Sequence, residues 1–313
     1  MRNDLSATAP DAWAPEISPP KRRSRARAFI VLTKPRVMEL LLVTTAPMMF
    51  LAERGLPSLW LFIATIIGGA LSAGSASSFN MYLDRDIDAK MQRTANRPLV
   101  TGEISPSAAL MFSWALAAAS CTWLWLLVNP AAAALSAFAI FFYVVIYTIL
   151  LKRRTSQNIV WGGIAGCFPV LIGWTAVTGS LSWPPVILFL VVFFWTPAHY
   201  WPLSMRYGDD YKRAGVPMLG AVRGATHVSA QVVVYAVATV LCSFALLPVA
   251  DMGGIYLVAA GTCGAWFVYE ASRLLRSSRS PFGSPRPMRV FHASNVYLSV
   301  LFLAVAVDPL LHL

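Results

Sequence analysis

Long apolar runs recur along almost the whole chain, and they constrain the fold more than any other feature. A membrane-spanning helix needs about 20 mostly apolar residues. The runs of that kind lie near Arg36–Leu51, Trp60–Tyr82, Ser107–Val128, Ala131–Leu151, Ile159–Thr178, Pro185–Met205, Ala225–Pro248, Met252–Leu274 and Phe291–Leu311. They are rich in Ala and Leu and do not alternate strictly, which favours helices over strands. The sequence therefore predicts an all-α integral membrane protein with nine transmembrane helices, covering residues 29–313.

The composition agrees with a membrane protein. Charged residues make up only 12% of the 313 residues, about half the share usual in soluble domains. The net charge of +11 could indicate nucleic acid, but the basic residues lie between the apolar runs, where membrane topology explains them. We therefore expect the lipid bilayer and an anionic substrate as partners, and no nucleic acid.

The basic residues also predict the orientation. When the nine runs alternate across a bilayer, every Lys and Arg except Arg54 falls on one side. Basic loops stay in the cytoplasm, so the N-terminus should be cytoplasmic and the C-terminus outside. Residues 1–28 are predicted to form a disordered cytoplasmic tail. Their acidic residues, Asp4, Asp11 and Glu16, count against a transit peptide. A bacterial inner membrane is the expected location, with a mitochondrial origin left open.

An acidic motif ends the second run at the cytoplasmic side, in residues 80–88. Asn80, Asp84 and Asp88 are four residues apart, so a helix places them on one face. Two carboxylates at this spacing repel each other unless a cation lies between them. Such oxygen ligands suit Mg²⁺ shared with phosphate oxygens. We predict a Mg²⁺ site here, whereas Asp86 lies on another face and is equally well explained as a solvated residue.

A second acidic cluster, Asp209-Asp210, follows the sixth run and lies beside basic residues. Either each cluster binds one Mg²⁺ ion of a diphosphate site, or one binds metal while the other orders the loop. Taken alone, the second cluster is equally well a surface turn. The further residues expected to hold the diphosphate or line the site are Arg36, Arg93, Arg97, Lys152, Arg153, Asn158, Tyr211 and Lys212. Lys152 and Arg153 are open to the simpler interpretation of topology charges.

These groups fit the loss of pyrophosphate from an allylic diphosphate. Mg²⁺ and basic side chains stabilise charge on the leaving group. The allylic cation needs an apolar pocket without water, and aromatic side chains attract it. We therefore predict a central cavity open to the cytoplasmic side. The pairs Gly68-Gly69 and Gly162-Gly163 lie inside the runs, which indicates close helix contacts rather than phosphate-binding loops.

Residues 80–100, NMYLDRDIDAKMQRTANRPLV, resemble the first signature of the UbiA-type intramembrane prenyltransferases. The chain is most similar to the branch of that family that farnesylates heme. The agreeing stretches are LTKPR (32–36), YTILLKR (147–153), NIVWGGIAG (158–166), WTPAHYW (195–201), DDY (209–211) and AGVPML (214–219). The resemblance runs in order from about Ala28 to the last apolar run.

The resemblance implies a reaction and a set of ligands. The donor would be farnesyl diphosphate and the acceptor heme b, whose vinyl group attacks the farnesyl cation. Water would complete the side chain of heme O, a precursor of heme A, and a downstream heme A synthase is a candidate partner. The family also implies Mg²⁺, with Asn80, Asp84 and Asp88 as the first ligands and Asp209 and Asp210 as the second-motif acids.

Two departures from the family pattern concern the second motif and the histidine. Relatives that prenylate aromatic acids or quinol precursors usually carry D-x-x-x-D, whereas Arg213 and Ala214 stand four residues after the acidic pair. Pro197-Ala198 precedes His199 where the family has Pro-Pro. His199 either contacts heme, as an axial ligand or a proton acceptor, or is a hydrogen-bonded histidine of the bundle.

Two other functions compete with heme farnesylation. A prenyltransferase for an aromatic acid or a quinone precursor is the nearest alternative, and the DDY and AGVPML stretches together with His199 argue against it. An ion-coupled secondary transporter is an alternative of another class. Transporters place their ionisable residues near the bilayer midplane, whereas Asp84 and Asp88 lie at a helix end among arginines.

Overall fold

The computed structural model describes residues 23–311, apart from the side chains of residues 36, 37, 40 and 41. This part of the chain is all-helical. Its long elements are α2 (Pro35–Glu53), α3 (Leu59–Leu83), α5 (Pro106–Leu127), α6 (Pro130–Phe141) with η1 (Phe142–Leu151), α7 (Asn158–Gly162) with η2 (Gly163–Cys167) and α8 (Phe168–Thr178), α9 (Trp183–Arg206), α12 (Ala225–Phe244) with α13 (Leu246–Val249), α14 (Gly254–Arg279) and α15 (Pro287–Val307) with η3 (Asp308–Leu310). The short helices are α1 (Arg25–Leu32), α4 (Arg85–Asp88), α10 (Gly208–Arg213) and α11 (Leu219–Val222).

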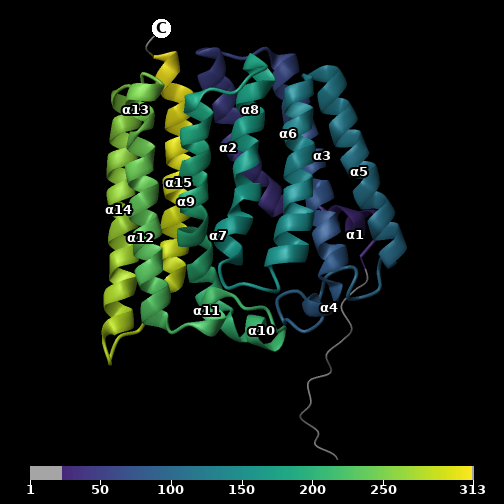
Figure 1. Ribbon diagram of the computed structural model, residues 1–313, viewed down its shortest axis with the longest axis vertical. Helices are drawn as coiled ribbons and strands as arrows, with labels where there is room; N and C mark the ends of the chain where they lie inside the picture. The colour runs from purple at the N-terminus through teal and green to yellow at the C-terminus, as the bar shows by residue number, and fades with distance from the viewer. Residues whose placement is uncertain (1–22, 312–313) are drawn as a thin grey trace, which may run out of the picture.

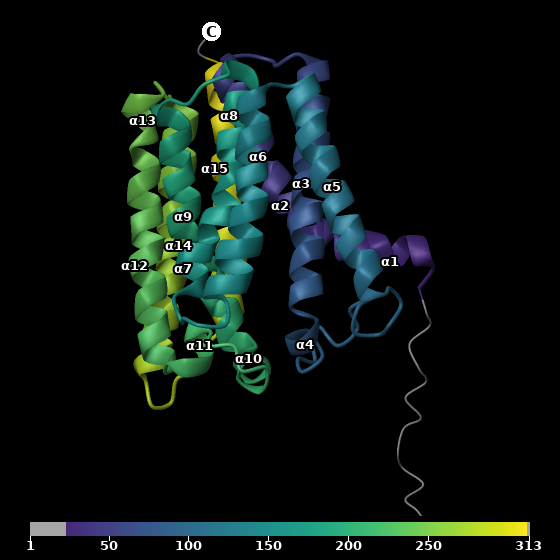
Figure 2. The same cartoon turned by 45° about the vertical axis from the view of Figure 1, so that its right-hand side comes forward.

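The long helices run roughly parallel and form one bundle (Figure 1). α4, α10 and α11 gather at its lower end, and the C-terminus lies at the upper end. Figure 2 shows α1 lying across the bundle direction, well above α4 and α10. The largest apolar core joins α9, α12, α14 and α15, and α3 packs mainly against α5.

Seven of the described helical segments are long and apolar enough to cross a membrane. They correspond to seven of the nine predicted spans. The other two are α2, whose described residues include the shorter apolar helix Leu42–Glu53, and α14, whose Tyr, Trp and Glu270 residues lower its mean hydropathy. The all-α multi-pass prediction is confirmed, and the count of nine stays a prediction.

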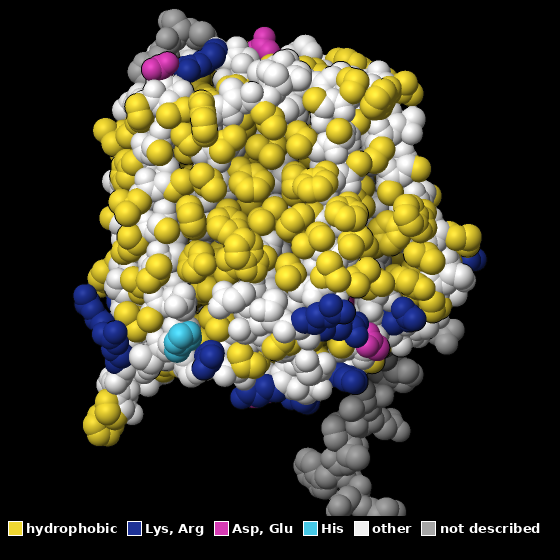
Figure 3. All heavy atoms as spheres, in the orientation of Figure 1, with side chains coloured by type: hydrophobic (Ala, Val, Ile, Leu, Met, Phe, Trp, Pro, Cys, Tyr) yellow, Lys and Arg dark blue, Asp and Glu magenta, His cyan; other side chains and the backbone are white. Residues whose placement is uncertain are grey.

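The surface shows the polarity expected of a membrane protein. In Figure 3 apolar side chains form a broad band across the middle of the face shown, and Lys and Arg gather toward its lower end. At the opposite end Arg54 donates to the carbonyl of Ala250 at 2.7 Å and lies 3.7 Å from Asp251. A band of this kind matches the hydrocarbon core of a bilayer, with charge outside it.

Local sequence sets where several helices begin. The side chains of Ser58, Ser105 and Asn129 accept the backbone N–H three residues on, at 3.3, 3.3 and 2.8 Å, as N-caps do. Pro106 and Pro130 occupy first helical positions, where a missing N–H costs nothing. α3, α5 and α6 therefore begin within one residue of the predicted spans.

Two predicted spans are irregular. The second half of the fourth is η1, a π-helix, and the fifth is broken by the 3-10 segment η2. Added Cβ atoms at Gly162 and Gly163 would lie 2.1 Å from the Tyr147 ring and 2.8 Å from Thr196. The predicted close contact is confirmed there, because only glycine lets these segments approach so closely.

The predicted tail ends earlier than residue 28. Residues 1–22 lie outside the described part of the chain, and α1 begins at Arg25 with Ser24 as its cap. Arg23 donates to Glu103 at 3.0 Å. This ion pair joins the start of the described chain to the loop before α5.

Candidate active site

Asn80, Asp84 and Asp88 lie together where α3 passes into α4. The Asn80 amide donates to Asp84 Oδ2 at 2.7 Å, and the Asp88 backbone N–H donates to the Asp84 carbonyl at 2.8 Å. All three residues are at most 2% exposed, whereas the Asp86 side chain is 56% exposed. The helical spacing therefore buries three polar side chains and turns Asp86 outward, as predicted.

Basic side chains from distant segments surround this motif. Lys152, at the end of η1, donates to Asp84 Oδ2, and Arg97 donates to Asp88 Oδ2 at 2.5 Å. Lys34, which precedes α2, donates to Asn80 Oδ1 at 2.7 Å. Two buried carboxylates thus lie among three basic side chains, an arrangement that suits an anionic ligand.

Arg153 has a different position from its neighbour Lys152. Both of its terminal nitrogens donate to the exposed Asp86 carboxylate at 2.7 Å, and Nη2 lies 3.6 Å from Asp84 Oδ1. This hydrogen bonding lowers the pKa of Asp86 to about 2. Arg153 therefore braces α4 from the solvent side, while Lys152 lies inside the cluster.

Lys34 belongs to the LTKPR stretch of the resemblance, and the structure places it against the acidic motif. Its backbone is left-handed at φ 52° and precedes Pro35, an uncommon conformation for a residue other than glycine. Burial, followed by repulsion from Arg97 and Lys152, lowers the pKa of Lys34. A strained backbone that holds a lysine against the acidic motif is typical of functional sites.

The residues present fit a Mg²⁺ ion. Asp84 Oδ1 and Asp88 Oδ1 are buried and have no hydrogen-bond partner among the described residues, although buried carboxylate oxygens usually have one. In that same part of the chain no group of three or more His, Cys, Asp or Glu side chains could hold a metal. Mg²⁺ often uses only one or two carboxylates together with substrate phosphates, so the two oxygens that accept no hydrogen bond suit an ion brought with a diphosphate.

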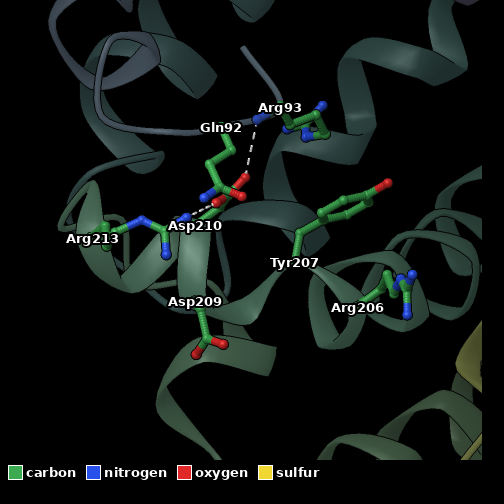
Figure 4. Close-up of a pocket in the computed structure, with 7 residues that line it drawn as sticks. All are labelled: Gln92, Arg93, Arg206, Tyr207, Asp209, Asp210 and Arg213. Carbon is green, nitrogen blue, oxygen red and sulfur yellow. Dashed lines mark hydrogen bonds and ion pairs between the residues drawn. The ribbon is translucent and has the colours of Figure 1, made fainter. Parts of the chain in front are cut away.

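The second acidic pair is divided between solvent and protein (Figure 4). The Asp209 side chain is 87% exposed and lies 3.9 Å from Lys212. Asp210 is buried, accepts from the Arg93 backbone N–H at 3.2 Å and also accepts from Arg213. Asp210 therefore joins two loops, as in the interpretation that one cluster orders the loop, and Asp209 points away from Gln92 and Arg93.

Tyr211 strengthens the same connection between loops. Its side chain is 2% exposed, and its hydroxyl accepts from Arg93 Nη2 at 3.3 Å. Arg93 also lies over the Tyr207 ring at 5.5 Å. A polar pocket of about 480 Å³ opens beside these groups, lined by Gln92, Arg93, Arg206, Tyr207, Asp209, Asp210 and Arg213.

His199 lies in the interface between α9 and α15. Its ring is stacked between Trp195 and Phe291, with centroids 4.2 and 4.5 Å away. Ser294 Oγ donates to the Phe291 carbonyl at 2.7 Å and lies 2.9 Å from His199 Nδ1. A hydroxyl has one proton, so Nδ1–H is assigned as the donor to Ser294, and Nε2 keeps its lone pair.

Two other predicted residues have different outcomes. Asn158 is fully buried, and its amide donates to the Thr155 carbonyl at 2.7 Å, so it orders the turn after Lys152. The side chain of Arg36 lies outside the described part of the structure. Thr148 was not among the predicted site residues, although the YTILLKR stretch contains it; it lies in the π-helix η1 with its hydroxyl 3.2 Å from the Asn80 amide.

An apolar cavity of about 170 Å³ lies among α2, α3, α6, η2 and α8. Its lining includes Ser77, three residues before Asn80 on α3, and Tyr143 on η1. The Tyr143 carbonyl accepts from Thr148, which also contacts Asn80. The cavity therefore begins beside the acidic motif and continues into the apolar part of the bundle.

The described residues thus form a helical bundle with helices long enough to cross a membrane and a buried Asn/Asp/Lys/Arg cluster at one end, an arrangement suited to an anionic ligand. A model of the UbiA prenyltransferase family matches residues 41–295. The chain belongs to this family, and the predicted resemblance is confirmed.

Similar proteins agree with this assignment. A protoheme IX farnesyltransferase of Pseudarthrobacter chlorophenolicus is 58% identical over 310 residues, covering 99% of this chain and 97% of that protein. One of Clavibacter michiganensis subsp. michiganensis is 60% identical over 289 residues, covering 92% and 94%.

Solved structures show the same fold. That of a UbiA homolog from Archaeoglobus fulgidus bound to DMAPP and Mg²⁺ has a TM-score of 0.66 at 17% identity, covering 90% of this chain and 99% of that one. A digeranylgeranylglyceryl phosphate synthase structure has a TM-score of 0.74 at 18% identity, covering 91% and 98%.

Proposed function

We propose that the protein transfers the farnesyl group of farnesyl diphosphate to a vinyl group of heme b, which yields heme O for heme A synthesis. The observation that carries this proposal is the buried cluster of Asp84, Asp88, Lys152 and Arg97, in which one oxygen of each carboxylate accepts no hydrogen bond from the described residues. The names of the similar proteins supply the donor and the acceptor. A downstream heme A synthase would consume the product.

The donor site is built by the acidic motif and its cations. Asn80, Asp84 and Asp88 would hold Mg²⁺, and the ion would neutralise charge on the diphosphate as it leaves. Lys152, Arg97 and Lys34 lie where they can donate to phosphate oxygens. Asp210 and Tyr211 hold the loop that contains Arg93. The exposed Asp209 and Lys212 serve solubility or the order of their own loop.

The reaction breaks the bond between the first farnesyl carbon and oxygen, and pyrophosphate leaves with the electron pair. The terminal carbon of the heme vinyl group then bonds to the allylic cation. Water adds its oxygen to the other vinyl carbon and loses a proton. The apolar cavity beside Tyr143 takes the isoprenoid tail and keeps water from the cation.

His199 is proposed to face the acceptor through Nε2, as an iron ligand or as the group that takes the proton. Replacing His199 by Ala is expected to lower kcat/KM for heme b roughly 100-fold, while the Kd of farnesyl diphosphate with Mg²⁺ stays unchanged. Heme titration followed by absorbance and product analysis measures both. An unchanged heme titration and turnover would make His199 a packing residue.

The matched control for this prediction is Ser294→Ala, which removes the acceptor of the Nδ1 proton. A smaller loss than in His199→Ala is expected, because the ring stays between Trp195 and Phe291 but no longer has a fixed tautomer.

The proposed topology has nine spans, a cytoplasmic N-terminus and an external C-terminus, in a bacterial inner membrane. The lysines and arginines of the active-site end support this orientation, and the site then opens to the cytoplasm. The transporter alternative is disfavoured by family membership, and the names of the similar proteins disfavour a quinone or aromatic-acid acceptor.

A product assay on the purified protein in detergent tests the proposal. Heme b, farnesyl diphosphate and Mg²⁺ are supplied, with a chelator as control, and the heme is identified by chromatography and mass. A heavier hydroxyethylfarnesyl heme that disappears with chelator is the expected result. Unchanged heme from folded protein, in an assay where a quinone precursor is prenylated, would reassign the acceptor and leave the diphosphate site standing.

A further inference from the structure

Two glycines line the apolar cavity at positions where close helix packing does not require a glycine. Gly69 on α3 and Gly166 on η2 both line the cavity. A Cβ atom added at either one would meet no atom within 4 Å. Glycine weakens a helix interior relative to alanine, so the absence of a side chain at both positions needs another explanation.

The neighbouring glycines show the contrast. An added Cβ at Gly68 would lie 2.4 Å from Leu124, and one at Gly163 would lie 2.8 Å from Thr196. Those two glycines are required by helix packing. The predicted close helix contact is therefore right for Gly68 and wrong for Gly69, whose hydrogen faces open space in the cavity.

The position of Gly69 relates it to the length of a ligand. It lies eleven positions before Asn80 on the same helix, which is about 16 Å along the axis. An extended chain of three isoprene units has a comparable length. Ser77, at the near end of the cavity, lies only three positions before Asn80. A chain that starts at the acidic motif and follows α3 thus ends beside Gly69.

We propose that Gly69 and Gly166 set the length of prenyl chain that the cavity accepts, by leaving the volume that the end of a farnesyl chain fills. This inference rests on the proposed function, because it takes the donor to be a prenyl diphosphate. A Cβ atom at these positions would meet no protein atom, and a larger side chain would displace the last isoprene unit. Chains that end before Gly69 would be unaffected.

The test compares diphosphates of one, two and three isoprene units: dimethylallyl, geranyl and farnesyl diphosphate. Their Kd values with Mg²⁺ are measured for wild type, Gly69→Leu and Gly166→Leu. In both variants the affinity for farnesyl diphosphate relative to dimethylallyl diphosphate is expected to fall at least about 10-fold, the scale set by burying several apolar carbons. Farnesylation of heme b should fall in parallel.

Gly261→Leu is the matched control. Gly261 lies within α14, away from the cavity lining, and an added Cβ there also meets nothing within 4 Å. The Gly261→Leu change alters helix propensity as Gly69→Leu does but leaves the cavity unchanged. The affinity ratio should therefore equal that of wild type. Gly69→Ala and Gly166→Ala provide smaller changes in the same direction if the leucine variants do not fold, and dimethylallyl diphosphate binding reports whether the phosphate site is intact.

The outcomes separate the two proposals. If wild type binds no prenyl diphosphate or farnesylates no heme, the proposed function fails. If wild type does both, and all Gly69 and Gly166 variants keep the wild-type affinity ratio, only the assignment of chain length to these glycines is overturned.

Discussion

Replacing Asp84 or Asp88 by Asn is expected to reduce farnesyl transfer to heme by at least about 1000-fold, because each change removes a charge on which Mg²⁺ and the leaving diphosphate depend. Both side chains are buried, and each has an oxygen that accepts no hydrogen bond from the described residues. The amide keeps the shape of the carboxylate but not its charge. Product formation and Mg²⁺-dependent binding of farnesyl diphosphate are the two measurements.

The control lies on the same short helix. Asp86→Asn removes a carboxylate that is 56% exposed and bonded to Arg153, and turnover should stay within about threefold of wild type, since exposed ion pairs contribute little. Because Asp84→Asn leaves Lys152 without its partner, Asp84→Glu is included as a variant that keeps the charge and displaces the ligand. Near-normal turnover in Asp84→Asn or Asp88→Asn would refute the metal assignment.

Replacing Lys152 by Gln is expected to lower kcat/KM for farnesyl diphosphate roughly 100-fold, the usual scale for losing one charged donor to a leaving group. Lys152 is 8% exposed and contacts Asp84 directly, so its charge acts inside the cluster. Initial rates at varied farnesyl diphosphate, with heme b saturating, measure the effect.

Arg154→Gln tests whether this charge merely sets topology. Arg154 follows two residues later in the same loop and is exposed, so both residues contribute equally to the positive-inside pattern. The Arg154 variant should retain wild-type rates. Equal rates in Lys152→Gln and Arg154→Gln would mean that Lys152 contributes only to membrane topology.

The acidic motif could be predicted because helix geometry is local. Positions four apart fall on one face of a helix. The structure places the Asn80 side-chain nitrogen 2.7 Å from Asp84 Oδ2 and turns Asp86 outward. The partners of this motif could not be predicted from spacing. Lys34 lies 46 residues from Asn80 in sequence, and Lys152 lies 68 from Asp84, so only the packing of helices brings them together.

The second motif shows where sequence alone is insufficient. Asp209 and Asp210 are adjacent and chemically identical, yet one is exposed and the other is buried between two loops. Which of two neighbouring side chains faces a partner depends on the path of the loop, and short loops at a helix end have no periodicity to reveal it. The same holds for Thr148, which lies in the π-helix η1 with its hydroxyl near the Asn80 amide.

The sequence by itself determined the all-helical membrane architecture, the starts of α3, α5 and α6, and the shared face of Asn80, Asp84 and Asp88. These depend on hydrophobicity, capping and helical period, which act over a few residues. Tertiary structure alone decided which cations enter the cluster and which glycines face the cavity. Gly68 and Gly69 differ only in what lies opposite each one, because that depends on how whole helices pack.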